Sequence, residues 1–377
     1  MKVAHILSWL NTGGAEKITT ELANLMSENN LKVKIISILP GRGIPYDIIN
    51  KERIEIVELN YKNKFNPRIA WDLYKLTLDC QIVHTHTFYA QFYASILISK
   101  NKLITTEHNT NNNRRKNILF KPLDYLMYKK YKRIICISSA TKVSLNNWIK
   151  STRSKSVVIN NGINTKKYWS SKPLDKEMLG INDNSCIILT CTARLSKVKN
   201  HVTLIKSLVG LKENYHLFLI GNGEKRDEIK QLILSNGLQD RITLLGNRDD
   251  VDRILKITDI FVLVSLWEGF GLAALEAILS NTYCILSDVE GLNNLVPKNN
   301  YVRYVDPLNP EQILKQITIL CEEIKTLKEN KSKNINNEEV IRYIMNNYDI
   351  NNTSEKYKSI YFEIMKEKKS RRMRWFI

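Results

Sequence analysis

The chain has little of what would mark a disulfide-stapled, metal-binding or membrane-embedded protein. None of its six cysteines belongs to a C-x-x-C pair, so they are expected to be small core residues in a reducing compartment. No run approaches the roughly 18 consecutive apolar residues that a transmembrane helix needs. The short apolar stretch at residues 3–10 also lacks the pattern of a signal peptide. We therefore expect a cytoplasmic globular protein without a metal site.

Acidic residues are scarce compared with basic ones. The net charge is +19, and residues 1–160 carry 25 Lys and Arg against 11 Asp and Glu. Basic surfaces attract nucleic acid, anionic membranes or phosphorylated ligands. Because no helix-turn-helix, zinc-finger or RNP pattern is present, nucleic acid is not the expected partner.

The order of apolar segments predicts two α/β domains. A chain of 377 residues is long for one core, and in both halves most short apolar strands are followed by a helix-forming segment. This order predicts two doubly wound parallel sheets whose carboxyl ends face one central cleft. We expect domains at residues 1–165 and 166–350, with a helix in 351–377 that packs back on the first domain.

A glycine-rich turn follows the apolar strand expected at residues 260–264. Gly269 and Gly271 break the strand, and helix formers run from Leu272 to Leu279, with Glu268 before the helix and Glu276 inside it. Backbone N–H groups at a helix start are unpaired and favour an anion such as a diphosphate. Such turns also occur in doubly wound domains without a ligand, so this turn alone does not define a site.

Two cations follow another expected strand, at residues 186–192. Arg194 and Lys199 lie at the strand end and at the start of an expected helix. Arginine can bind a phosphate through two nitrogens, and lysine acts as a point charge. Together they suit a diphosphate.

In the first half, polar residues also gather at strand ends. Gly13 and Gly14 would let a ligand approach the backbone, although an ordinary turn is an alternative. His84 and His86 alternate on one strand face, and without an acidic or cysteine partner nearby they predict a polar strand end. His108 follows the strand at 102–106 and is either a loop histidine or a contact to substrate.

Residues 109–133 interleave basic and aromatic side chains. Arg114 and Arg115 precede Ile118–Phe120, and Lys129 and Lys130 follow Tyr125–Tyr128. This pattern is typical of a surface that rests on anionic lipid headgroups, with a solvated helix face as the alternative.

In order and spacing, several of these motifs resemble the retaining glycosyltransferases of family four, which have the GT-B fold. The resemblance is strongest over residues 185–295. Ala193 stands where the family often has glycine. The motifs that carry the resemblance are Ala193-Arg194-Leu195 with Lys199-Asn200, Gly221-Asn222-Gly223-Glu224, Glu268-Gly269-Phe270-Gly271-Leu272 with Glu276, Gly13-Gly14-Ala15-Glu16 and Glu107-His108.

The resemblance implies roles for these residues. Arg194 and Lys199 would hold the donor diphosphate in place of a metal ion, and no cofactor would be required. Glu268 and the backbone of Phe270, Gly271 and Leu272 would position the donor sugar. Glu276 would bind the ribose, Gly246-Asn247-Arg248 would face the base, Gly14 would approach the phosphates, and His108 would contact the sugar. Gly13, Glu16, Arg114, Arg115, Lys129 and Lys130 would lie on the acceptor or membrane side.

The expected function is metal-independent, retaining transfer of a sugar from a nucleotide sugar, expected to be a UDP-hexose or UDP-N-acetylhexosamine. The acceptor would be an oligosaccharide or lipid-linked glycan in capsule or O-antigen synthesis, on the inner face of the cell membrane. Two alternatives stay open. A sugar-nucleotide 2-epimerase of similar fold matches the Arg-Lys and two-glutamate set less well. A basic nucleic-acid-binding protein leaves Glu268 and Glu276 without a role.

Overall fold

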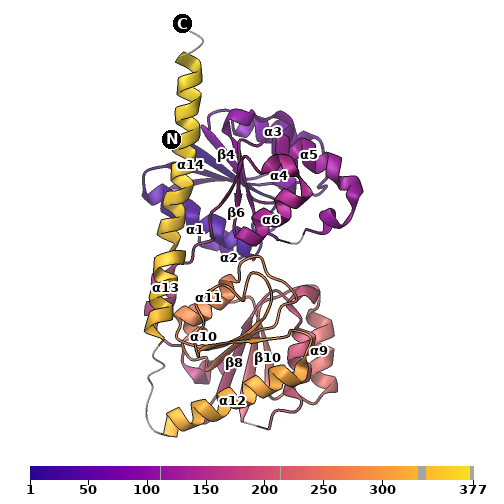
Figure 1. Cartoon of the computed structure of the whole chain (residues 1–377), viewed down its shortest axis with the longest axis vertical. Helices are drawn as coiled ribbons and strands as arrows, with labels where there is room; N and C mark the ends of the chain where they lie inside the picture. Colours follow the sequence, from indigo (N-terminus) through magenta and orange to yellow (C-terminus); the bar gives the residue numbers. More distant parts are fainter. Residues whose placement is uncertain (111, 213, 330–336, 374–377) are drawn as a thin grey trace. The chain divides into compact units, whose positions relative to one another are not determined.

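The computed structural model describes residues 1–110, 112–212, 214–329 and 337–373. The chain divides into two compact units (Figure 1). Unit 1 comprises Met1–Gly162 with Ile350–Ile377, and unit 2 comprises Ile163–Asp349. Unit 1 is therefore built from both ends of the chain.

Unit 1 contains a parallel sheet with the strand order β3-β2-β1-β4-β5-β6-β7. Its strands are mostly buried, because helices cover both faces of a parallel sheet. The strand order reverses between β1 and β4. The strands are β1 (Lys2–Leu7), β2 (Lys32–Ser37), β3 (Ile54–Glu58), β4 (Ile82–Thr85), β5 (Leu103–Glu107), β6 (Arg133–Cys136) and β7 (Ser156–Val158).

Two apolar clusters occupy the two faces of this sheet. One contains side chains of α3, α4, α5 and α6, and the other contains side chains of α1 and α14. The helices are α1 (Gly14–Glu28), α2 (Ile44–Asp47), α3 (Arg68–Leu76), α4 (Phe88–Leu97), α5 (Lys121–Lys129), α6 (Ser139–Trp148) and α14 (Ile350–Met373), with short 3-10 turns η1 (Lys100–Lys102), η2 (Asn113–Lys116), η3 (Ile118–Phe120) and η4 (Lys150–Thr152).

Unit 2 contains a second parallel sheet, with the strand order β10-β9-β8-β11-β12-β13. Here the order reverses between β8 and β11. The strands are β8 (Ile187–Thr192), β9 (Tyr215–Ile220), β10 (Ile242–Gly246), β11 (Ile260–Leu263), β12 (Tyr283–Ser287) and β13 (Val302–Val305).

The helices of unit 2 form two packed groups. Helix α8 contacts α9 and α12, whereas α11 contacts α7, α10 and α13. The helices are α7 (Thr165–Ser170), α8 (His201–Leu208), α9 (Arg226–Ser235), α10 (Val251–Leu255), α11 (Leu272–Leu279), α12 (Pro310–Glu329) and α13 (Glu338–Tyr348), with 3-10 turns η5 (Lys176–Leu179) and η6 (Lys197–Lys199).

The two parallel-sheet α/β units confirm the predicted fold class, and the differences from the prediction are local. Strands β7 and β13 are not singled out by the sequence. The helix expected around Arg194–Asn200 begins later, at His201. Asn200 has a left-handed φ of 54°, which an α-helix cannot contain, so Lys199 lies in η6 instead.

Helix α14 is held to unit 1 by buried aromatic side chains. Tyr361 Oη lies 2.6 Å from His84 Nδ1, and Tyr357 Oη lies 3.2 Å from Thr106 Oγ1. All four side chains are fully or almost fully buried. Since buried polar groups without partners are costly, these contacts fix α14 in one register on the sheet.

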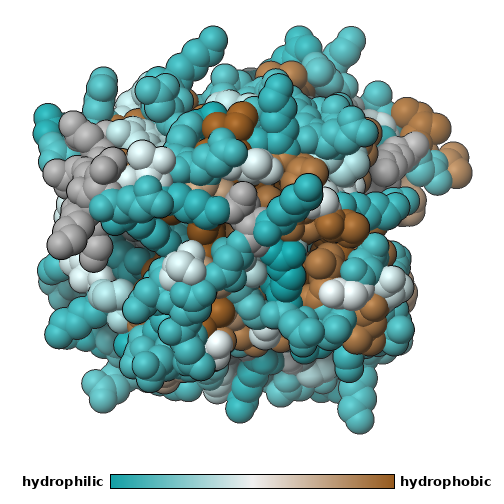
Figure 2. All heavy atoms as spheres, turned by 90° about the horizontal axis from the view of Figure 1, so that it is seen from below, coloured by the Kyte–Doolittle hydropathy of each residue, from teal (hydrophilic) through white to brown (hydrophobic). Residues whose placement is uncertain are grey.

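The described part of the chain contains no helix that could span a membrane, because none combines the length and apolar character needed to cross a bilayer. Figure 2 shows one face of the molecule, on which hydrophilic side chains predominate and hydrophobic areas lie between them. All six cysteines are buried and free.

Replacing Tyr361 by phenylalanine tests the contact with α14. Tyr361→Phe leaves the ring in place but removes the hydroxyl that meets buried His84, so we expect the free energy of unfolding to fall by about 1–2 kcal/mol. Urea unfolding followed by circular dichroism measures the change. Tyr125→Phe, on the exposed side of α5, is the control, and equal stability of the two variants would contradict the expectation.

Candidate functional site

The first part of the candidate site lies where the strand order of unit 2 reverses. Ligands of open α/β sheets bind beyond the carboxyl ends of the strands at such a reversal. The ladder between β8 and β11 pairs only Ile260 with Leu189 and Phe261 with Thr190, so it stops before either strand ends. Lys199 follows β8 and Glu268 follows β11. The two loops are joined by the Leu266 N–H, which donates to Val198 O at 2.8 Å.

Lys199 and Glu268 form an ion pair at this reversal. Lys199 Nζ contacts Glu268 Oε1, which also accepts a 2.8 Å hydrogen bond from Ser265 Oγ. The side chains of Lys199 and Glu268 are 23% and 11% exposed. Partial burial strengthens the attraction between them compared with a surface pair. The ion pair therefore holds both side chains in position before any ligand binds.

Two glycines shape the turn that carries Glu268. Gly271, with φ 69°, is the N-cap of α11, and Gly291, with φ 93°, lies on the loop after β12. A Cβ on Gly291 would lie 2.5 Å from Glu268 O, and one on Gly271 would lie 2.5 Å from Leu292 Cδ2. Only glycine fits both the space and the backbone conformation. The turn between Glu268 and the start of α11 is therefore closely packed against the loop after β12.

Arg194 does not join the Lys199–Glu268 pair. Its guanidinium instead contacts Glu224 Oε2, at 3.2 Å from Nε and 3.1 Å from a terminal nitrogen, and its side chain is 67% exposed. The backbone beneath it is closely packed, because a Cβ on Gly221 would lie 2.2 Å from Ala193 O. Arg194 is thus an exposed cation on a closely packed loop.

The remaining predicted donor residues lie further along the same edge. Gly246, with φ 69°, ends β10, two strand spacings or about 10 Å from β8. Asn247 follows it, and Arg248 contacts Asp250 through two nitrogens at 2.8 and 2.6 Å. On α11, Glu276 is buried at 5% exposure. Phe270, at 6% exposure, packs edge-on against Tyr348.

The second part of the candidate site lies at the reversal in unit 1. There the Thr87 hydroxyl accepts the Ser8 N–H at 2.7 Å, which joins the loops after β1 and β4. Gly13 caps α1, which begins at Gly14. A Cβ on Gly13 would lie 2.3 Å from Glu16 Oε2. The Glu16 carboxylate therefore folds back over the start of its own helix.

His108, which is half-buried, belongs to a chain of histidines with the buried His5 and His86. His5 Nδ1 lies 2.9 Å from His86 Nε2, and His86 Nδ1 lies 3.2 Å from His108 Nε2. His84 stacks on His86 with 4.3 Å between ring centroids. Burial lowers the pKa of His5 to about 4 and that of His108 to about 3. The pKa values of His84 and His86 are also well below the usual range, because both are buried and face other histidines.

Three of these histidines also have the spacing of metal ligands. One ring nitrogen each of His5, His84 and His86 lies within 4.8 Å of the others. Both ring nitrogens of His84 already have hydroxyl partners, Tyr361 Oη at 2.6 Å and Thr106 Oγ1 at 2.8 Å. Hydrogen bonding therefore accounts for the buried His84 without an ion. His84 and His86 are both buried at the end of β4, as part of this cluster.

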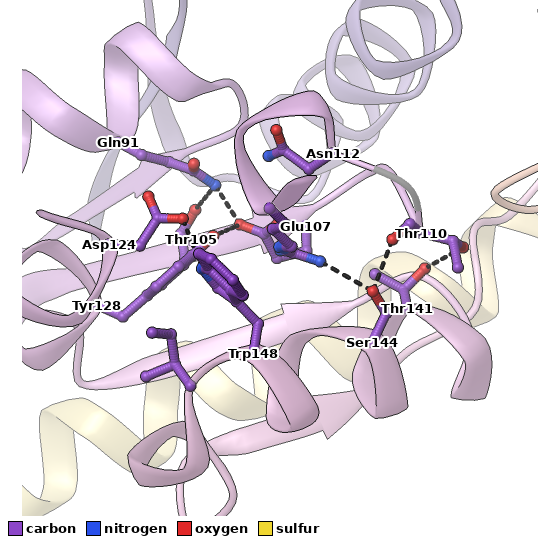
Figure 3. A network of polar contacts seen from close by, with 12 residues as sticks. Gln91, Thr105, Glu107, Thr110, Asn112, Asp124, Tyr128, Thr141, Ser144 and Trp148 are labelled. Carbon is purple, nitrogen blue, oxygen red and sulfur yellow. Dashed lines mark hydrogen bonds and ion pairs between the residues drawn. The ribbon is translucent and has the colours of Figure 1, made fainter. Parts of the chain in front are cut away.

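Arg114 and Arg115 are not part of an exposed basic surface. Arg115 contacts Glu107 at 2.9 Å, and Arg114 contacts Asp124 at 3.4 Å. The side chain of Arg115 is only 8% exposed, and that of Arg114 is 14% exposed. Figure 3 shows Glu107 and its neighbours; Glu107 also accepts from Gln91 at 2.6 Å. The predicted membrane role for these arginines needs correction, because the carboxylates behind them draw both side chains into the unit.

The basic and aromatic stretch does have an exposed face on α5. Tyr125, Leu126, Lys129 and Lys130 are exposed, whereas Met127 is buried. Residues three and four apart share one side of a helix, so the exposed side is both apolar and basic. On the preceding η3, Ile118 and Leu119 are 63% and 80% exposed.

Sequence patterns missed several residues of the candidate site. His5 aligns with His84 across β1 and β4, and this register is not visible in the sequence. Ser265 precedes Glu268 by three residues and could have been suspected from its place at a strand end. The Thr192 hydroxyl, at the end of β8, is buried without a hydrogen-bond partner in the described part of the chain.

Two family models match the chain, one in each half. The model "Glycosyltransferase Family 4" matches residues 12–167, and the model "Glycosyl transferases group 1" matches residues 171–338. Together they span most of the chain. The matches include Gly13 and His108 in unit 1 and the loops after β8, β9, β10 and β11 in unit 2.

Curated relatives are similar along the whole chain. An Escherichia coli UDP-Gal:alpha-D-GlcNAc-diphosphoundecaprenol alpha-1,3-galactosyltransferase is 26% identical over 388 aligned residues, covering 98% of each chain. A Campylobacter jejuni N-acetylgalactosamine-N,N'-diacetylbacillosaminyl-diphospho-undecaprenol 4-alpha-N-acetylgalactosaminyltransferase is 24% identical, covering 88% of this chain and 93% of the relative.

Solved structures share the fold. A glycosyltransferase from Rickettsia africae aligns with a TM-score of 0.78 at 24% identity, covering 97% of this chain and 98% of the other. HepE from Anabaena, in complex with UDP and glucose, aligns with a TM-score of 0.81 at 16% identity, covering 96% and 100%.

The buried histidines make stability depend on pH. Their folded-state pKa values lie below the ordinary value of 6.5, so as pH falls the unfolded chain takes up protons that the folded chain does not. We expect the free energy of unfolding to rise between pH 5.5 and 7, by up to about 1.4 kcal/mol per pH unit for each histidine. Urea unfolding across this window measures it. His5→Leu should reduce the slope, and a flat profile would contradict the expectation.

Proposed function

The chain belongs to glycosyltransferase family 4 and has the GT-B fold, and from this premise we propose that it moves a sugar from a nucleotide sugar to a lipid-linked glycan with retention of configuration. The observation that carries the proposal is the Lys199–Glu268 pair at the strand-order reversal of unit 2. It places a cation and a carboxylate where an open α/β sheet binds its ligand.

The donor diphosphate is proposed to bind between Lys199, Arg194 and the start of α11. Lys199 is held in place by Glu268, and unpaired N–H groups of α11 favour an anion. The Arg194–Glu224 pair is exposed, so its loss costs little when Arg194 turns toward phosphate. Fixed cations near the leaving group would stabilise the negative charge that grows as the sugar bond breaks. The proposed mechanism therefore requires no metal ion or other cofactor.

The other donor contacts are proposed from the order of strands along the edge. Glu268 and the backbone of Phe270, Gly271 and Leu272 would position the sugar, because Gly271, with φ 69°, lets the chain turn at the start of α11. Glu276 on α11 would bind the ribose. The loop of Gly246, Asn247 and Arg248 would face the base, since β10 lies two strands from β8.

His108 is proposed to contact the donor sugar. Its Nδ1 is buried and has no hydrogen-bond partner in the described part of the chain, which leaves it available for a sugar hydroxyl. Hydrolytic glycosidases place two carboxylates on opposite sides of the sugar. In unit 1 the carboxylate next to His108, Glu107, is occupied by Gln91, Tyr128 and Arg115. A front-face retaining route fits this arrangement.

The acceptor is proposed to be a sugar attached to undecaprenyl diphosphate. Two relatives that align along most of their length act on diphosphoundecaprenol-linked sugars, as their names state. The donor would then be a UDP-hexose or UDP-N-acetylhexosamine, and the product an intermediate of capsule or O-antigen synthesis. The exposed apolar and basic side of η3 and α5 would rest on the anionic inner face of the cell membrane.

Removing the Lys199 charge tests the donor site. Lys199→Met should lower turnover at least a hundredfold, because an electrostatic contact that acts on the leaving group is worth about 2.7–4 kcal/mol. Lys197→Met is the matched control, since Lys197 lies two residues away and is exposed. Transfer of radiolabelled sugar from UDP-galactose, UDP-glucose or UDP-N-acetylhexosamines to a diphosphoundecaprenol-linked sugar measures turnover.

Two further measurements identify the donor and the type of reaction. Protection of the wild-type chain against thermal unfolding by UDP-, GDP- and ADP-sugars identifies the base. Near wild-type turnover of Lys199→Met would refute the assigned donor site. Formation of an epimer from nucleotide sugar alone, without an acceptor, would favour the epimerase.

Removing the exposed groups of η3 and α5 tests the membrane surface. We expect Leu119→Ser with Lys129→Ala and Lys130→Ala to lower binding to vesicles that contain phosphatidylglycerol at least tenfold, since each lysine near the surface contributes about 1 kcal/mol. Cosedimentation measures binding. Lys166→Ala with Lys230→Ala, at exposed positions of unit 2, controls for net charge. Equal binding of both variants would exclude this surface.

A further inference from the structure

Three histidines of unit 1, of which His5 and His86 are buried, are joined in series by their ring nitrogens. His5 Nδ1 meets His86 Nε2 at 2.9 Å, and His86 Nδ1 meets His108 Nε2 at 3.2 Å. The two outer nitrogens, His5 Nε2 and His108 Nδ1, are buried without a hydrogen-bond partner among the described residues. The series therefore has two ring–ring contacts and an unpartnered nitrogen at each end. One of these end nitrogens belongs to His108, which is proposed to contact the sugar.

The protonation state of the series limits how its hydrogens can be arranged. Burial lowers the pKa of each ring, so all three are neutral near pH 7 and each has one N–H. If His86 donates from Nδ1 to His108, its Nε2 must accept from His5 Nδ1. If His86 donates from Nε2 to His5, its Nδ1 must accept from His108 Nε2. No other arrangement keeps both hydrogen bonds.

We propose that His5 and His86 are positioning residues that set the tautomer of His108, and hence whether His108 Nδ1 donates or accepts a hydrogen bond. In one arrangement all three rings have the hydrogen on Nδ1, and in the other all three have it on Nε2. His5, which is fully buried on β1, thereby acts on His108 through His86. The catalytic consequence rests on the proposed function, because it requires His108 to contact the donor sugar.

The surroundings of His86 keep the series in place. His84 stacks on His86 with 27° between the ring planes, and its own ring nitrogens are held by Tyr361 and Thr106. His86 therefore has little room to rotate, and a change of tautomer is the remaining way to alter its hydrogen bonds. His84 has hydroxyl partners that can donate or accept, so it lies outside the coupled set.

Nitrogen-15 NMR of the histidine rings tests the coupling without any substrate. In the full chain at pH 7, His5, His86 and His108 should show the same tautomer, or the same proportion of both. His5→Leu should shift the tautomer proportion of His108, although residue 5 does not touch it. His216→Asn, in unit 2, should leave His108 unchanged. Different tautomers in the wild-type rings, or an unchanged His108 in His5→Leu, would overturn the proposal. Stoichiometric Zn²⁺ binding to these rings would also overturn it.

A pair of variants at His86 tests the effect on catalysis. An asparagine amide reaches the position of Nδ1 and keeps the contact with His108, whereas a glutamine amide reaches the position of Nε2 and keeps only the contact with His5. We expect kcat of His86→Gln to be about tenfold below that of His86→Asn, the factor for one lost hydrogen bond, at a similar KM for the donor. Equal kcat values of the two variants would show that His86 acts only through packing, and would overturn the catalytic part of the proposal. If the wild-type chain transfers no sugar, the proposed function fails, and the NMR result still decides the coupling.

Discussion

The reversal of strand order in each sheet is the constraint on which both parts of the candidate site depend. On either side of the reversal the connections leave in opposite directions, so the loops at the carboxyl ends separate and leave backbone and polar side chains uncovered. In unit 2 this brings Lys199 and Glu268 together from two strands that pair over only two residues. In unit 1 the same reversal places the Gly13 turn beside the strand of His84.

The two cations of the proposed donor site differ in exposure. Lys199 is partly buried and shares Glu268 with Ser265, so its position is fixed by the fold. Arg194 is largely exposed, and its contact with Glu224 contributes little to stability. In the proposed mechanism the partly buried lysine would order the leaving group in advance, and the exposed arginine would approach after the donor binds. The high net charge of the chain does not by itself produce this difference between Lys199 and Arg194. The difference depends on how deeply each ion pair is buried.

Hydrophobic periodicity and strand-end motifs were sufficient to predict the two sheets, most strands, and the placement of Lys199 and Glu268 at neighbouring strand ends. What the sequence could not supply were partners distant along the chain. His5 meets His86 because β1 aligns beside β4. Arg115 appears in a basic run, yet Glu107 draws it into the unit. Charge patterns give the sign of a side chain but not the buried carboxylate that it meets.

The histidine series also depends on the last segment of the chain. Tyr361 lies 277 residues from His84 in sequence, yet its hydroxyl meets the imidazole that stacks on His86. Unit 1 thus lacks part of its core, and the hydrogen-bond partner of a buried histidine, until α14 has packed. Long-range contacts of this kind slow folding, because closing a long loop costs entropy before the contact forms. The position of His108 is consequently linked through His86 and His84 to a helix that the chain adds only after it has passed through unit 2.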